Sequence, residues 1–66
     1  MPKTLDELAK LIANRDGISY EEGLAAVRDC AADMEQAFYS GNLDEVEDIL
    51  RMDLGLEPEF LDIFIF

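Results

Sequence analysis

The acidic side chains that could form ionic contacts with a partner are concentrated in the second half of this 66-residue chain. Residues 33–66 contain ten acids and a single base, Arg51, whereas residues 1–32 contain six acids and four bases. Carboxylates on a folded surface form charge-assisted hydrogen bonds with Lys and Arg side chains. We therefore predict a surface that binds a basic protein, made by Asp44, Glu45, Glu47, Asp48, Asp53, Glu57, Glu59 and Asp62.

The chain lacks the residues on which most catalytic sites depend. It has no His to act as a general base, and Cys30 lies among alanines with no obvious activating base. Ser19 and Ser40 fit cap or turn positions, and a bundle of this size offers little room for a substrate cleft. We expect a protein that is not an enzyme, with no catalytic residue and with Cys30 as a buried structural side chain.

One short segment, residues 14–19, resembles the middle of a calcium-binding EF-hand loop. With Gly17 at the sixth loop position, Ile12 takes the first position and Gly23 the twelfth, where the loop requires carboxylates. A junction between two helices explains the same residues without a metal. We therefore expect neither a metal site nor a cofactor.

Net charge also limits the partners of this chain. At −11, with a pI near 4.1, it should repel nucleic acid and anionic membranes. Its bases are scattered along the sequence: Lys3, Lys10, Arg15, Arg28 and Arg51. No segment resembles a signal peptide or is apolar for long enough to span a membrane, and a single cysteine fits a reducing compartment. We expect a cytoplasmic protein with no direct nucleic-acid or membrane contact.

Helix starts and stops divide the chain into four segments. A small polar residue followed by Glu three positions later is typical of a helix N-terminus, and the pattern occurs at Thr4, Ser19 and Asn42. Glycine is typical just beyond a helix C-terminus, and proline is typical in a first turn. The glycines at 17, 41 and 55 and the proline at 58 therefore predict helices over residues 5–14, 20–40, 43–54 and 58–65.

Apolar spacing predicts how these helices pack. Steps of three and four residues in the second segment predict a continuous seam, which consists of Tyr20, Leu24, Val27, Ala31, Met34 and Phe38. Its other flank carries small residues that allow close helix approach: Ala25, Ala26, Cys30, Ala32 and Ala37. The sequence predicts one all-α domain over residues 1–66, a small bundle of three to four helices with a long central second helix.

The last seven residues are too apolar for one small core to cover completely. In one interpretation, Phe60, Leu61 and Phe64 close the end of the bundle. In the other, part of the segment is an exposed contact for a second copy or a partner. The residues predicted for a homodimer contact are Phe60, Ile63, Phe64, Ile65 and Phe66.

Two segments give the chain a resemblance to a known class of proteins. Residues 12–22 and residues 54–61 form a layout similar to that of small acidic helical proteins from phages and mobile elements, and size, acidity and helicity resemble anti-CRISPR inhibitors. Such a resemblance implies inhibition by binding, often through acidic residues that imitate nucleic acid. It carries no catalytic residue onto this sequence.

These observations lead to one main functional hypothesis and three alternatives. The main hypothesis is a phage-type inhibitor in the bacterial cytoplasm that binds a basic nucleic-acid-binding protein, such as a CRISPR effector, through the predicted acidic surface. The first alternative is a helical interaction or dimerisation module with an apolar C-terminal contact, whose acidity serves solubility. The others are a regulator that binds a transcription factor and weak collection of divalent cations by residues 44–48.

Overall fold

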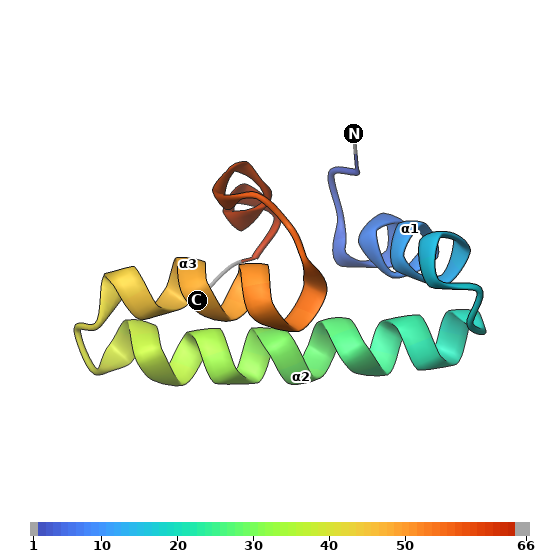
Figure 1. Cartoon of the computed structure of the whole chain (residues 1–66). Helices are drawn as coiled ribbons and strands as arrows, with labels where there is room; N and C mark the ends of the chain where they lie inside the picture. Colours follow the sequence, from blue (N-terminus) through green and yellow to red (C-terminus); the bar gives the residue numbers. More distant parts are fainter. Residues whose placement is uncertain (1, 65–66) are drawn as a thin grey trace.

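The structure is a computed structural model that describes residues 2–64. It contains α1 (Leu5–Asp16), α2 (Tyr20–Tyr39), α3 (Leu43–Leu54) and a short 3₁₀ helix, η1 (Pro58–Ile63) (Figure 1). The described residues are helical or connecting segments, with no strand. The predicted all-α bundle with a long central second helix is confirmed.

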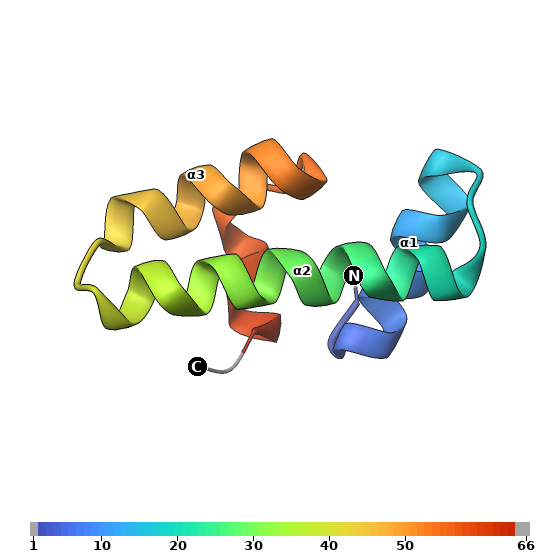
Figure 2. The same cartoon turned by 90° about the horizontal axis from the view of Figure 1, so that it is seen from below.

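Helix α2 is the element against which the others are arranged. Helix α1 packs across its N-terminal half, and α3 runs back along its C-terminal half, so both lie on the same side of α2 (Figures 1 and 2). The 3₁₀ helix η1 packs on α3. Residues 40–42 form the turn between α2 and α3 and bring the acidic α3 beside α2.

Two of the three predicted helix starts have the expected geometry. The Glu7 amide donates to the Thr4 hydroxyl at 3.1 Å. At the start of α2, the Glu22 amide donates to Ser19 Oγ at 3.1 Å, and the Ser19 amide donates to the Glu22 carboxylate at 3.0 Å. These bonds use backbone donors that have no partner within the helix, and they fix where α1 and α2 begin.

The third predicted helix start is in the expected place, since Asn42 precedes α3, but the expected cap bond is absent. The Asn42 side chain accepts no hydrogen bond from the first turn of α3. The side-chain nitrogen, Asn42 Nδ2, instead donates to the Glu45 carboxylate at 2.6 Å. The stop signals are confirmed, because Gly17 and Gly55 both adopt the left-handed conformation immediately after α1 and α3.

The buried stripe of α2 is rotated from the predicted seam. Val27 and Met34 are buried as expected, but Leu24 and Ala31 are partly exposed and Phe38 is 41% exposed. The buried positions of α2 are Gly23, Val27, Cys30, Met34 and Ala37. Three of these positions, Gly23, Cys30 and Ala37, have small side chains or none, which allows neighbouring helices to approach α2 closely.

Gly23 is the point of closest approach between α1 and α2. A Cβ atom built at this position would lie 2.6 Å from the Ala9 carbonyl oxygen and 3.3 Å from the Ala13 side chain. A backbone oxygen has little freedom to move away. The α1–α2 contact therefore requires a residue without a side chain at position 23.

The fourth predicted helix differs most from the structure. Residues 58–63 form a 3₁₀ helix, and Phe64 has extended backbone angles. Hydrogen bonds from the Phe60 amide to the Glu57 carbonyl and from the Phe64 amide to the Leu61 carbonyl, both 3.0 Å, show the three-residue spacing of this helix type. The predicted helix end at residue 65 lies outside the described residues. The other bounds differ modestly, since α1 extends to Asp16 and α2 ends at Tyr39.

Candidate protein-interaction surface

All eight carboxylates predicted to bind a partner are exposed. Four of them lie in the first half of α3, where successive residues point about 100° apart around the helix axis. The buried stripe of α3, formed by Val46, Leu50 and Leu54, faces the bundle and separates the two flanks of the helix. These four acids therefore spread over the outward half of α3, from one flank of the buried stripe to the other.

One flank of α3 forms a groove with α2. The groove has a volume of about 420 Å³ and contains three carboxylates among its lining residues, which are Asp33, Gln36, Ala37, Ser40, Glu45, Ile49 and Asp53. It brings two predicted residues, Glu45 and Asp53, together with Asp33 from α2. Sequence reasoning missed Asp33 because its membership depends on how α2 and α3 pack. The sequence offered one signal: Asp33 directly precedes Met34 of the predicted seam and lies one helical turn before Ala37.

The opposite flank of α3 borders a more apolar hollow of about 320 Å³. Glu47 is its acidic member, and its lining residues are Phe38, Leu43, Val46, Glu47, Leu61 and Phe64. Two other predicted residues, Glu59 and Asp62, line a third hollow with Lys3 near the start of the chain. The structure therefore places five of the eight predicted acids around three separate depressions. The other three, Asp44, Asp48 and Glu57, line none of these.

Few of these acids are neutralised within the chain. Arg51 Nη2 lies 2.8 Å from Asp48 Oδ1, one turn away on α3. Among the predicted acids that the structure describes, Asp48 is the one in an ion pair. The protonated Glu59 side chain donates a hydrogen bond to Glu57. This bond and the negative charge of Glu57 raise the pKa of Glu59, since a second charge close by is unfavourable. The surface therefore retains most of its negative charge.

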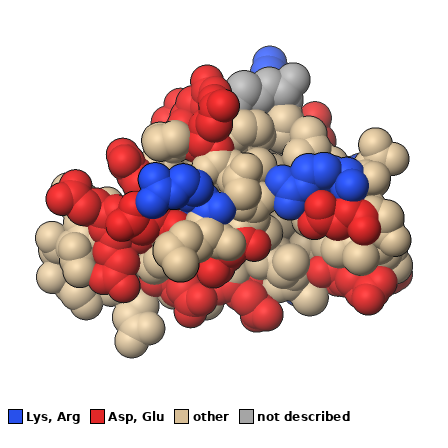
Figure 3. All heavy atoms as spheres, viewed as in Figure 1, with Lys and Arg blue, Asp and Glu red and all other residues tan. Residues whose placement is uncertain are grey.

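Carboxylates and bases alternate over part of the surface. Figure 3 shows acidic side chains over α3, along α2 and around η1, with basic side chains between them on the viewed face. Exposed pairs of this kind are weak individually and are screened by salt. The excess of acids is therefore a property of the α3 half of the molecule, and it does not form one uninterrupted patch.

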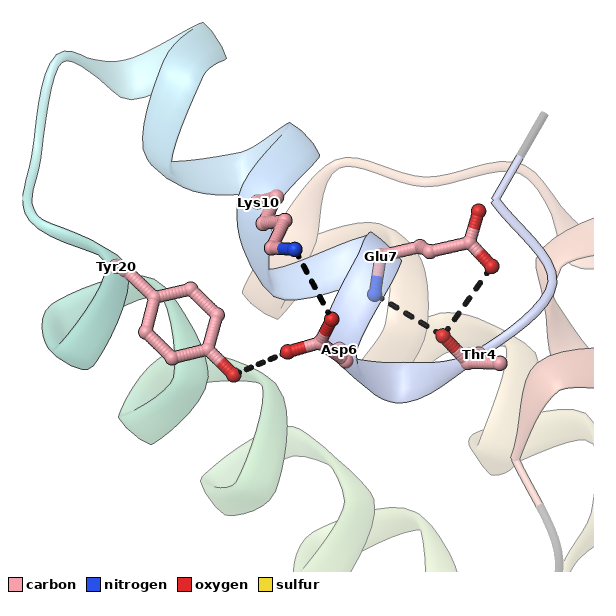
Figure 4. A network of polar contacts seen from close by, with 5 residues as sticks. All are labelled: Thr4, Asp6, Glu7, Lys10 and Tyr20. Atoms are coloured by element: carbon pink, nitrogen blue, oxygen red, sulfur yellow. Dashed lines mark hydrogen bonds and ion pairs between the residues drawn. The ribbon is translucent and has the colours of Figure 1, made fainter.

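The N-terminal half uses its polar side chains to join helices. The Tyr20 hydroxyl of α2 donates to Asp6 of α1, and Lys10 Nζ lies 3.3 Å from the same carboxylate (Figure 4). The hydrogen bond from Tyr20 and then that from Lys10 lower the pKa of Asp6, and the bond to Asp6 raises the pKa of Tyr20. Asp6 and Tyr20 therefore hold α1 against α2.

The bond between Tyr20 and Asp6 predicts a pH window for stability. The pKa of Asp6 is lowered from 3.8 in the folded state. Its contribution to the free energy of unfolding is therefore present above that value and is lost as the pH falls through the lower folded pKa. The pKa of Tyr20 is raised from 10.0 in the folded state. Its contribution to the free energy of unfolding is therefore present below that value and is lost as the pH rises through the higher folded pKa. Chemical denaturation should therefore show the largest difference between wild type and Tyr20→Phe at about pH 5–9. Tyr39→Phe, at an exposed tyrosine, is the control, and a Tyr20→Phe effect independent of pH would contradict the role of the bond.

Arg15 joins the ends of α1 and α3. Its Nη1 donates to the Leu54 carbonyl at 2.7 Å, and its Nε and Nη2 contact the Asp16 carboxylate at 2.8 and 3.1 Å. The hydrogen bond to Asp16 raises the pKa of Arg15, and Arg15 lowers that of Asp16. A guanidinium at the last carbonyls of α3 also opposes the negative end of the helix dipole. This contact fixes the end of α3, from which the acidic segment continues.

Cys30 has the surroundings of a structural residue. Its side chain is buried, and burial raises its pKa to about 12, with smaller contributions from the negative charges of Asp53 and Asp33. The thiol is therefore protonated at neutral pH and is a poor nucleophile. The expectation of a buried Cys30 is confirmed.

The C-terminal apolar segment packs largely on its own chain. Ile63 and Phe64 are 9% and 6% exposed and belong to the core, while Phe60 and Leu61 are partly buried against it. Of the residues predicted for a homodimer contact, Ile63 and Phe64 are therefore taken up by the chain's own fold. Ile65 and Phe66 lie outside the described residues.

Two kinds of feature are absent from the described residues. No group of three or more His, Cys, Asp or Glu side chains among residues 2–64 has a metal-binding arrangement. In the same range, no helix combines the length and the apolar character required to cross a bilayer.

Fold and surface define a small acidic all-α bundle. Comparisons with protein-family models, with curated proteins and with solved structures find no match for the chain. Its function is therefore argued from the surface itself.

Proposed function

We propose that this chain is a binding protein that occupies the cationic nucleic-acid channel of another protein. The observation that carries the proposal is the set of eight exposed carboxylates on and after α3, in a half of the chain whose single base, Arg51, pairs with Asp48. In the complex, these carboxylates accept hydrogen bonds from Lys and Arg side chains that otherwise hold phosphates. No covalent bond is made or broken.

The helical scaffold supports this role because it holds the carboxylates at fixed separations. Glu45 and Asp53 lie eight residues apart on the same flank of α3, which corresponds to about 12 Å along the helix axis. Asp33 of α2 faces the same groove. A partner that binds this flank meets charges already arranged by the fold, so that less conformational entropy is lost on binding.

The more specific form of the proposal is a phage-type inhibitor in the cytoplasm of a bacterial host, with a CRISPR effector as its expected target. The chain's small size, its helical fold and its net charge of −11 support this form. A CRISPR effector suits the mechanism because it holds its guide–target duplex in a positively charged channel through backbone contacts. A homodimer through the C-terminal segment is less well supported, since Ile63 and Phe64 already lie in the core.

Salt dependence tests the proposal. The tagged chain should capture one or a few basic proteins from a bacterial lysate at low salt, and these should elute as salt rises. Raising ionic strength from 0.1 M to 1 M shortens the screening length from about 10 Å to about 3 Å, which weakens contacts between exposed charges. Captured proteins that stay bound equally well at high salt would contradict an electrostatic mechanism and would favour an apolar contact.

A further inference from the structure

The hollow between the end of α2, α3 and η1 combines an apolar lining with a single carboxylate. Its volume of about 320 Å³ is at the lower end of the range for ligand pockets, and Glu47 is the acid among its lining residues. One of its lining residues, Leu43, is 60% exposed. The Phe38 ring packs edge-on against Tyr39, with ring centroids 5.4 Å apart. The hollow therefore presents apolar side chain to solvent next to a carboxylate.

We propose that this hollow binds an amphipathic, Lys- or Arg-bearing helix of the protein that the acidic surface captures. An apolar side chain of that helix enters between Leu43 and Leu61, and a basic side chain lies with its aliphatic stem on the hollow and its charged end at Glu47. The inference rests on the proposed function, to which it adds the type of segment that is bound.

Charge complementarity favours this occupant over a second copy of the chain. Each copy has a net charge of −11, and a symmetric contact through this hollow would bring two copies of Glu47 into one interface. Like charges across an interface disfavour association. A cationic helix instead satisfies both the apolar lining and the carboxylate.

Defined peptides test the proposal on the full chain. The probe is a synthetic helical peptide with Leu on one face and Lys on the other; one comparison peptide has Glu in place of Lys, and another has the same Lys residues without the Leu face. Binding is followed by amide chemical shifts in NMR spectra. We expect the amphipathic Lys peptide to shift the resonances of Leu43 and Leu61 and to bind about tenfold more tightly than the peptide without Leu.

Matched substitutions on the exposed surface of α3 locate the contact. Leu43→Ser and Glu47→Gln should each weaken binding of the amphipathic Lys peptide, by about tenfold and about threefold respectively. Met52→Ser, at a residue that is 79% exposed elsewhere on α3, and Glu21→Gln, at an exposed acid in the first turn of α2 that is not part of the predicted acidic surface, should have little effect. Equal effects of Leu43→Ser and Met52→Ser would overturn the proposal, as would equally tight binding of the Glu peptide.

The remaining outcomes separate failure of this inference from failure of the proposed function. If the Lys peptide without Leu binds as tightly as the amphipathic one, the acidic surface binds cations but the hollow has no role. If neither Lys peptide binds, the proposed function fails as well. Dimerisation that Leu43→Ser abolishes would identify a second copy as the occupant. Much tighter peptide binding by a chain that ends at Phe64 would identify the chain's own last residues as the occupant, and either result would overturn the inference.

Discussion

Reversing four charges on α3 should abolish capture of the cationic partner while the helical fold remains. The variant carries Asp44→Lys, Glu45→Lys, Glu47→Lys and Asp48→Lys, which changes the net charge from −11 to −3. All four side chains are exposed, so the core is unchanged. Each lost surface pair contributes up to about 1 kcal/mol, and the new lysines repel the partner, so that affinity should fall about a hundredfold or more.

The matched control carries the same change in net charge at four exposed acids outside the predicted acidic surface. Glu7→Lys, Glu21→Lys, Asp29→Lys and Glu35→Lys also alter two acids in first turns of helices and two acids further along a helix. The two variants therefore experience comparable effects of the helix dipole. Affinity measured by calorimetry, with circular dichroism of both variants, separates location from net charge. Equal losses in the two variants would show that net charge alone is responsible.

Gly23→Ala should destabilise the fold by about 1–2 kcal/mol, although alanine is the better helix former. The new Cβ would lie 2.6 Å from the Ala9 carbonyl oxygen, so α1 has to move away from α2. Because the close atom is a backbone oxygen, this movement should fall in the upper part of the range of about 1–3 kcal/mol for overpacking, which exceeds the gain in helix propensity of about 1 kcal/mol. The midpoint of thermal unfolding should fall by several degrees.

A second variant on α2 calibrates the propensity of glycine relative to alanine. Ala32 is exposed on α2, so Ala32→Gly should cost about 1 kcal/mol through propensity alone. Chemical denaturation of both variants compares the two effects directly. A Gly23→Ala protein that is more stable than wild type would contradict the close α1–α2 packing, since propensity would then decide the sign.

Local signals in the sequence predicted much of the fold. The caps at Thr4 and Ser19 and the stops at Gly17 and Gly55 depend on residues within one turn of each other, and the structure has them as expected. The Asn42 cap failed because its side chain bonds the Glu45 carboxylate instead of the backbone. Such competition between partners is not visible in residue spacing.

Features that depend on tertiary packing could not be predicted in the same way. The rotation of the α2 stripe toward Gly23 follows from how closely α1 lies, and the Arg15 bond to the Leu54 carbonyl joins residues 39 positions apart. For the candidate site, the sequence identified exposed acids but not their separation onto two flanks of α3. Asp33 joins the groove only through the pairing of α2 with α3.

Competition with nucleic acid tests the central claim most directly. A captured partner, once purified, is mixed with a labelled nucleic acid that it binds, and the chain is added at low salt while fluorescence anisotropy is recorded. The proposed mechanism predicts that the chain displaces the nucleic acid completely, and that the partner never holds both at once. A ternary complex of partner, nucleic acid and chain, with the anisotropy undiminished at saturation, would show that the carboxylates of α3 do not occupy the phosphate-binding channel.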